Sequence, residues 1–252
     1  MTRRRWIADE VSNNRAALTG EHAEHLIRVL RAQVGQEFDI AADDIVRRGR
    51  IVSIEAGRVE FELGEEVPAP VLMHVTLLLA VFKFDRMEWA IEKCTELGVS
   101  RIVPMIARRT DAHLADASAK RVERWRRIAV QASEQSRRAA PPEIAAPLKL
   151  REAASLAGAS RIVLAESLAE SLAESDQQIQ LRDVLVPSRP DHDLLLAIGP
   201  EGGWTEDELQ LFRNSGWIFA TLGPTILRAE TAAIAAVAIA ISELGEPRLP
   251  VK

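Results

Sequence analysis

The first third of the chain alternates polar and apolar residues in short runs, which is typical of β-strands. Runs at 4–7, 38–40, 49–54 and 58–63 are separated by Gly and Asp residues that favour turns. Between the first two runs, Leu26, Val29 and Leu30 recur at helical spacing. Several short strands of this kind favour a small β-barrel. Two prolines and two carboxylates within 65–70 break the pattern, so we expect a barrel over 1–69 and a second domain over 70–252.

From residue 71 onwards, apolar runs alternate with amphipathic stretches, which predicts an α/β domain. Strands are expected over 71–81, 101–105, 161–165, 194–198 and 217–222, with helices over 85–97, 119–138, 206–215 and 230–244. Repeated strand–helix–strand units imply a parallel sheet. The last helix is almost entirely Ala, Ile and Val, so we expect it to be buried on every side, against the sheet and a second subunit. Three tandem Leu-Ala-Glu-Ser copies over 164–175 predict a surface loop or short helix.

Composition and charge add a candidate partner to this picture. The chain lacks a long apolar segment and has one cysteine, Cys94, which argues against membrane insertion, export and a disulfide and favours the cytoplasm. Because Cys94 lies in a helical pattern, we interpret it as a packing residue. The net charge of −5 argues against nucleic acid, but residues 101–138 carry ten basic and four acidic side chains. This arginine-rich segment is either an RNA contact or a solvated helix face with internal ion pairs.

The stretch 198–205 reads Ile-Gly-Pro-Glu-Gly-Gly-Trp-Thr and joins a buried strand to a helix. Thr205 and Glu208 have the spacing of a capping box. The glycines allow the backbone to approach a ligand closely. Carboxylates at Glu206, Asp207 and Glu208 oppose an anionic ligand, and the loop lacks the P-loop and Gly-x-Gly-x-x-Gly patterns. The loop therefore favours a nucleoside without phosphates, the alternative being an ordinary glycine-rich turn.

Further motifs follow one another along nearly the whole chain. They are His25, 29–31 and Gly35; Lys83, Arg86 and Glu88; 92–99, Ile102, Pro104 and Arg109; Lys120, Arg121 and Trp125; 134–136, Arg138 and Pro142; 198–203; and 222–223 with 226–232. In this order and spacing they resemble the ribosomal small-subunit (16S) RNA methyltransferase E family of the SPOUT superfamily. The chain departs from that family near 41–48, where Ala-Ala-Asp-Asp-Ile-Val-Arg-Arg replaces a common Asp-Gly turn.

The resemblance implies a fold and an activity. The first domain would be a PUA-like RNA-binding barrel and the second a SPOUT α/β domain with a parallel sheet and a trefoil knot. The enzyme would bind S-adenosylmethionine without a metal and methylate N3 of one uridine in small-subunit ribosomal RNA, within the assembled subunit. It would act as a homodimer, with neither membrane nor DNA as a partner. Alternatives are a non-catalytic RNA-binding or ribosome-assembly protein and a SPOUT methyltransferase for another RNA nucleotide.

The resemblance also implies roles for individual residues. The cofactor-binding candidates are Leu164, Glu166, Gly199, Pro200, Glu201, Gly202, Gly203, Leu222, Gly223, Ile226 and Leu227. An ion pair between Glu201 and Arg228 would tie two of these loops together. Arg138, Arg109 and Arg228 are the catalytic candidates, because a cation stabilises the negative charge that develops on uridine N3. The RNA-binding candidates are Arg4, Arg28, Arg31, Lys83, Arg86, Arg121 and Arg124. No proton acceptor is identified.

Overall fold

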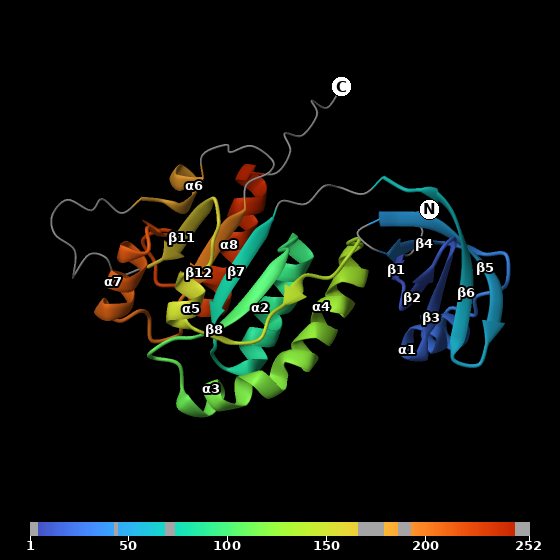
Figure 1. Cartoon of the computed structure of the whole chain (residues 1–252), viewed down its shortest axis with the longest axis horizontal. Helices are drawn as coiled ribbons and strands as arrows, with labels where there is room; N and C mark the ends of the chain where they lie inside the picture. The colour runs from blue at the N-terminus through green and yellow to red at the C-terminus, as the bar shows by residue number, and fades with distance from the viewer. Residues whose placement is uncertain (1–4, 43–44, 69–73, 166–178, 186–192, 245–252) are drawn as a thin grey trace, which may run out of the picture. The chain divides into compact units, whose positions relative to one another are not determined.

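The chain divides into two compact units (Figure 1). The computed structural model describes residues 5–42, 45–68, 74–165, 179–185 and 193–244. The first unit comprises Met1–Val71 and Val130–Pro141, and the second comprises Leu72–Ala129 and Pro142–Lys252. The predicted boundary near residue 69 and most of the Leu-Ala-Glu-Ser copies lie outside the described residues. The sequence pattern did not predict that residues 130–141 would group with the N-terminal segment.

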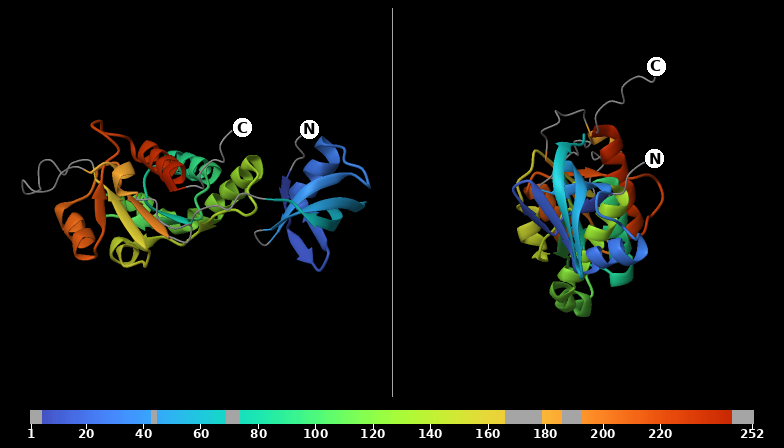
Figure 2. Two further views of the ribbon diagram at one scale, coloured as in Figure 1. Left: turned by 90° about the horizontal axis from the view of Figure 1, so that it is seen from above. Right: turned by 90° about the vertical axis from the view of Figure 1, so that its right-hand side faces the viewer.

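The first unit is a six-stranded sheet that curls into a barrel-like form (Figure 2). Its strands are β1 (Arg5–Ile7), β2 (Glu10–Ser12), β3 (Arg15–Thr19), β4 (Glu37–Ala42), β5 (Ile45–Glu55) and β6 (Arg58–Glu66), in the order β1-β4-β5-β6-β3-β2. The two end strands, β1 and β2, are separated only by Ala8 and Asp9, and the Asp9 N–H donates to the Ala17 carbonyl of β3. One nearly continuous segment therefore forms both ends of the sheet, which makes the sheet curl.

The interior of this sheet holds the apolar residues that alternate along the strands. Leu18, Ile40 and Phe61 are fully buried together with Leu26, which comes from the predicted helical stretch. That stretch forms α1 (Gly20–Glu24) and a π-helical turn, η1 (His25–Val29). The strands predicted over 38–40, 49–54 and 58–63 are confirmed as β4, β5 and β6.

The second unit contains a parallel seven-stranded sheet, as predicted. Its strands are β7 (Val75–Ala80), β8 (Arg101–Ile106), β9 (Glu143–Ile144), β10 (Leu148–Lys149), β11 (Ser160–Leu164), β12 (Leu194–Ile198) and β13 (Ile218–Ala220). Their order is β10-β8-β7-β12-β11-β13, with β9 beside β8. Successive residues of β12 enter different cores: Leu196 and Ile198 join one, and Leu195 and Ala197 join the other. Burial of both faces explains the uninterrupted apolar runs in the sequence.

Helices cover this sheet. They are α2 (Phe84–Leu97), α3 (Ala112–Ser118), the 3-10 turn η2 (Ala119–Arg121), α4 (Val122–Ser136), α5 (Leu150–Ala154), α6 (Leu181–Val184), α7 (Glu206–Asn214) and α8 (Ala229–Leu244). Gly98, with φ of 111°, ends α2, and Gly216, with φ of 73°, follows α7. Helices often end at a residue in the left-handed backbone conformation, which glycine adopts most easily. The predicted helix over 119–138 begins later, at Val122, because η2 precedes it.

The C-terminal helix α8 differs in one respect from the prediction of burial on every side. It packs against α2, β7 and β12, and one face is buried, including Ala233, Ala236 and Ala240. Ile234 and Ile239 are only partly buried against the same core. The chain by itself therefore covers one face of α8 and leaves the other half-exposed. No helix in the described part of the chain, α8 included, is long and apolar enough to span a membrane.

Candidate functional site

The loops predicted to bind a cofactor follow three neighbouring strands of the second unit. All strands of this sheet are parallel, and β11 pairs with both β12 and β13. The carboxyl ends of β11, β12 and β13 therefore lie at the same edge of the sheet (Figure 1). The carboxyl edge of an open parallel sheet is the usual place for a ligand site.

The loop after β12 has a conformation that requires glycine at two of its positions. The Gly203 N–H donates to the Pro200 carbonyl at 2.8 Å, and Gly203 has φ of 71°, a left-handed value that glycine adopts without strain. A Cβ atom on Gly199 would lie 3.0 Å from the indole ring of Trp204. The loop is thus a tight turn packed against the aromatic side chain that follows it.

Trp204 connects this loop to the end of β11. Its indole Nε1–H donates to the Leu164 carbonyl at 2.8 Å, and the hydrogen bond is buried. The ring also packs edge-to-face on Phe212 of α7 at a centroid distance of 5.0 Å. Trp204 was not among the residues predicted for the site, although an aromatic residue directly after a Gly-Gly pair was a usable signal. Its hydrogen bond places the backbone of Leu164, a predicted cofactor residue, beside the glycine-rich loop.

Arg109, which follows β8, also holds this loop in place. Its Nη1 donates to the Gly202 carbonyl at 2.6 Å and to the Trp204 carbonyl at 3.2 Å. A Cβ atom on Gly202 would lie 3.2 Å from the Arg109 Cδ, so the glycine and the arginine stem pack closely. Arg109 was predicted as a catalytic residue. In the structure its guanidinium fixes the position of the loop backbone.

The capping box at the start of α7 is confirmed. The Glu208 carboxylate accepts hydrogen bonds from the Thr205 N–H at 2.8 Å and from the Thr205 hydroxyl at 3.0 Å. Its other oxygen accepts the Arg108 N–H at 2.6 Å. Glu208 is buried, so its charge is satisfied by three donors. The same side chain that caps α7 therefore also connects α7 to the loop after β8.

The predicted ion pair between Glu201 and Arg228 is wrong. The Glu201 carboxylate instead pairs with Arg86, whose Nη1 lies 2.5 Å from Oε1. Arg86 is in the first turn of α2, which follows β7, and β7 is paired directly with β12 in the sheet. Arg86 Nε also lies 3.7 Å from the carboxylate of Glu230, in the first turn of α8. The two loops are tied together as predicted, but through Arg86 and Glu230. Arg228 is exposed and has no ion pair with any described residue.

The loop after β13 presents the remaining predicted cofactor residues. Leu222 and Leu227 are partly buried and pack on the core of the second unit. Gly223 has φ of 138°, which favours glycine at that position. Ile226 is 88% exposed, so its whole side chain is available for contact. Glu166, the last predicted cofactor residue, lies outside the described residues.

The arginine-rich segment is partly neutralised within the second unit. Arg124 pairs with Glu88 through two hydrogen bonds of 2.6 and 2.8 Å, and Arg121 lies 3.8 Å from the same carboxylate and stacks over Phe84. Arg127 is exposed and has no ion pair among the described residues. Within that part of the chain, the ion pairs expected of a solvated helix face are therefore present at Arg121 and Arg124, and contact with RNA stays a prediction.

The other predicted contact residues are distributed over both units. Arg28 pairs with Glu24 in the first unit, where Arg31 has a left-handed φ of 49°. Lys83 is the exposed N-cap residue of α2 in the second unit. Arg138 follows α4 and belongs to the first unit, whereas Arg109 and Arg228 belong to the second. Arg4 lies outside the described residues.

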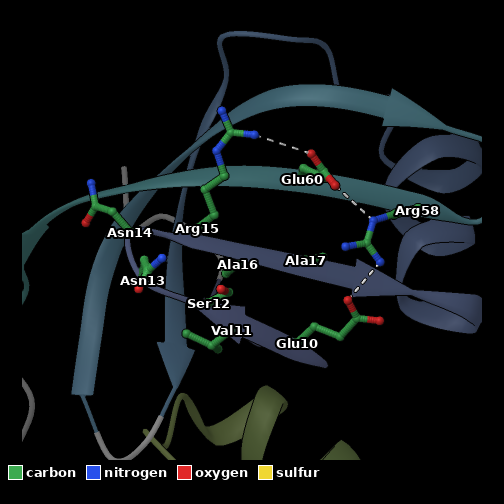
Figure 3. A pocket seen from close by; sticks show the side chains of 10 residues that line it. All are labelled: Glu10, Val11, Ser12, Asn13, Asn14, Arg15, Ala16, Ala17, Arg58 and Glu60. Carbon is green, nitrogen blue, oxygen red and sulfur yellow. Dashed lines mark hydrogen bonds and ion pairs between the residues drawn. The ribbon is translucent and has the colours of Figure 1, made fainter.

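A hollow in the surface of the first unit carries balanced charges (Figure 3). It lies between the β2–β3 hairpin and the neighbouring strand β6. Arg58 pairs with Glu10 at 2.9 Å and with Glu60 at 3.0 Å, and Arg15 lies 3.9 Å from Glu60. Two arginines and two glutamates neutralise one another, so this hollow offers no net attraction for a phosphate.

Cys94 is confirmed as a packing residue. It is fully buried in α2 among the apolar residues of the second unit. Burial raises the pKa of its thiol far above the ordinary value, so the thiolate that nucleophilic catalysis needs is not populated.

Comparison with known proteins identifies the family. Residues 68–241 match the family model described as an RNA methyltransferase domain. The chain is 32% identical over 235 residues to the ribosomal RNA small subunit methyltransferase E of Synechocystis sp., covering 91% of this chain and 74% of that protein. It is 32% identical over 241 residues to the protein of the same name from Mycobacterium bovis, covering 91% and 86% respectively.

Solved structures agree with the sequence relatives. The ribosomal RNA small subunit methyltransferase E of Neisseria gonorrhoeae, bound to S-adenosyl methionine, has a TM-score of 0.80 and 27% identity, covering 97% of this chain and 99% of that one. A putative methyltransferase from Legionella pneumophila, in complex with the same cofactor, has a TM-score of 0.79 and 27% identity, covering 98% and 100%. The chain therefore belongs to the ribosomal RNA small subunit methyltransferase E family.

Proposed function

We propose that this protein transfers a methyl group from S-adenosylmethionine to N3 of a uridine in small-subunit ribosomal RNA. The observation that carries the proposal is the likeness, over 97% of the chain, to a Neisseria protein of this family that holds S-adenosyl methionine. The glycine-rich loop after β12, held in place by Trp204 and Arg109, supports it. The first unit would bind RNA as a PUA-like barrel, and the second would be the methyltransferase domain.

The loops after β11, β12 and β13 would hold the cofactor. Backbone groups of 199–203 would meet its adenosine, and Leu222, Ile226 and Leu227 would supply apolar contacts to the ring. The bound sulfonium supplies an activated methyl group, so no metal is required.

The arginines of the chain would stabilise the reacting uridine. Methyl transfer forms the N3–C bond as the S–C bond breaks, and the N3 proton leaves to an acceptor, so negative charge develops on the base. Arg228 is exposed and without an ion pair in the described part of the chain, which makes it the leading candidate in the second unit. Arg138 remains a candidate, whereas Arg109 is engaged by two loop carbonyls. Since N3 lies on the Watson–Crick edge, the target uridine must be unpaired or flipped out.

The assembly would be a cytoplasmic homodimer acting on the assembled small subunit. The partly buried isoleucines Ile234 and Ile239 of α8 form an apolar surface that a second copy would cover. Sedimentation equilibrium tests this: wild type should be a dimer and Ile239→Glu a monomer, and a monomeric wild type would refute it. A trefoil knot, which the family resemblance implies, is part of the proposal. An experimental trace of residues 160–230 tests the knot.

Calorimetric titration with S-adenosylmethionine tests the cofactor site. Wild type should bind, and Gly202→Val should not, because its side chain would displace Arg109, whose Cδ lies only 3.2 Å from the place that a Cβ atom at residue 202 would occupy. Gly202→Ala, with one methyl group, should lose less affinity than the valine variant. Full affinity in Gly202→Val would place the cofactor elsewhere. Gly57→Ala, in a barrel turn with φ of 73° and no neighbour within 4 Å, is the control for general backbone strain.

The alternatives make different predictions. A non-catalytic RNA-binding protein would bind RNA with a steep salt dependence but would not transfer a methyl group. A methyltransferase with another target would transfer the group to a different nucleotide. Mass-spectrometric mapping of the modified nucleotide separates these cases from the proposed one.

A further inference from the structure

We propose that Arg86 is a positioning residue that sets the distance between the two candidate cofactor loops, a role that rests on the proposed function. Its guanidinium lies between two carboxylates: Glu201 belongs to the loop after β12, and Glu230 directly follows the loop after β13. The sequence resemblance assigned Arg86 to RNA. The geometry points to the cofactor loops instead.

Glu230 is the buried part of this arrangement. The residue is 3% exposed, and its Oε2 atom is buried without a hydrogen-bond donor in the described part of the chain. Within those residues Arg86 is the only side-chain cation within 4.0 Å of its carboxylate. A buried carboxylate is stable only when a nearby cation or donor compensates it. Arg86 therefore holds the start of α8, and with it the end of the preceding loop, in place.

Glu201 is the more exposed part. Its side chain is 38% exposed and that of Arg86 is 30% exposed. An exposed pair contributes little by itself, but this one shares its guanidinium with the buried carboxylate of Glu230. The planar fork of an arginine can meet two carboxylates at once, which the single ammonium of a lysine does less well.

The backbone of Arg86 is held in place by the core of the second unit. It lies in the first turn of α2, next to Met87, which is fully buried. The Met87 N–H donates to the Lys83 carbonyl at 2.9 Å, and α2 begins shortly after β7, the strand paired with β12. The positions of both loops are thus fixed relative to the first turn of α2. Loss of Arg86 would leave two carboxylates that repel each other across the site.

The sign of the effect separates positioning from simple electrostatics. S-adenosylmethionine carries a net positive charge at pH 7. Removal of a nearby cation would therefore strengthen its binding if Arg86 acted only through its charge. If Arg86 sets the spacing of the loops, its removal must weaken binding instead.

The test is calorimetric titration of the full-length protein with S-adenosylmethionine. Arg86→Gln should weaken binding by about tenfold, as expected for loss of hydrogen bonds to a charged group, and Arg86→Lys should restore only part of it. Arg101→Gln is the control, because it removes an arginine that is paired with a glutamate, Glu143 at 3.1 Å, but at the amino-terminal end of β8, away from the cofactor loops. Its affinity should match that of wild type.

Further measurements distinguish the possible outcomes. In methyl-transfer assays, KM for the cofactor should rise in Arg86→Gln more than kcat falls, and RNA affinity should not change. Cofactor affinity equal to or greater than that of wild type would overturn the proposal, as would a loss confined to RNA binding. If Arg86→Gln does not fold, Glu201→Gln tests the same link without disturbing the buried Glu230; an unchanged affinity there would also overturn it. Failure of wild type to bind the cofactor would instead refute the proposed function.

Discussion

Replacement of Trp204 by phenylalanine should weaken cofactor binding much more than the equivalent change at Trp217. The two indoles flank Phe212 at centroid distances of 5.0 and 5.1 Å. Each donates a buried hydrogen bond to a backbone carbonyl: Trp204 to Leu164 at 2.8 Å and Trp217 to Ala154 at 2.9 Å. Only the Leu164 carbonyl lies at the proposed cofactor edge. The two substitutions are therefore matched in chemistry and burial and differ in location.

The magnitude follows from the lost hydrogen bond. A buried carbonyl left without its donor costs about 1–3 kcal/mol, and the smaller ring adds a similar packing cost in both variants. In Trp204→Phe the loop after β12 is no longer hydrogen-bonded to the end of β11, so part of the cofactor's binding free energy is used to order this loop. If about 1–2 kcal/mol of that cost falls on binding, the dissociation constant rises about 5- to 30-fold. In Trp217→Phe the cost falls on stability alone.

Urea denaturation followed by circular dichroism and calorimetric titration with S-adenosylmethionine measure the two quantities. Both variants should lose stability, and only Trp204→Phe should lose substantial affinity. Equal affinity losses in the two variants would show that the cofactor responds to general loosening of this core. Unchanged affinity in Trp204→Phe would show that the loop does not need its link to Leu164.

Three further predictions concern stability and reactivity. Glu208→Ala should lower the stability of the second unit by about 1–2 kcal/mol, because the change removes the capping box and the acceptor of the Arg108 N–H. Glu206→Ala, in the same helical turn, should change this stability by less than about 0.5 kcal/mol. Thermal melts of the two variants compare these effects. Cys94 should resist alkylation at pH 8 until the protein unfolds, because burial raises the pKa of its thiol; rapid labelling of the native protein would contradict its burial. Burial raises the pKa of the Glu134 carboxyl, with partial compensation by the neighbouring His22, so the native state holds this proton to a higher pH than the unfolded chain, and stability falls as pH rises between the two pKa values. Glu134→Gln should therefore stabilise the first unit more at pH 7 than at pH 4, and an equal effect at both pH values would refute this.

The parallel sheet was predictable because its signal is local. The run Leu194 to Ile198 contains no polar residue, since its successive side chains enter two different cores. The capping box at Thr205 and Glu208 was also readable, because both partners lie within one helical turn. In the first unit, β2 was missed because all three of its residues are exposed, which removes the alternation on which a strand prediction depends.

The contacts that fix the site were less predictable because they join residues far apart in the chain. The sequence suggested that Glu201 needs a cation, but 115 positions separate it from Arg86. Only the sheet order, which places β7 beside β12, makes Arg86 the neighbour. The loop contact of Arg109 depends in the same way on the position of β8. Residue type thus indicated the chemistry of the site, and topology decided which residues meet.

The most direct test of the proposed activity is mapping of the nucleotide that the protein modifies. Small ribosomal subunits from a strain that lacks the modification would be incubated with the protein and S-adenosylmethionine, and the RNA would be digested and analysed by mass spectrometry. We predict one methyl group on N3 of a single uridine, absent when the Gly202→Val variant replaces wild type. Methylation of another atom or nucleotide, or no transfer by a protein that binds the cofactor, would contradict the proposed function.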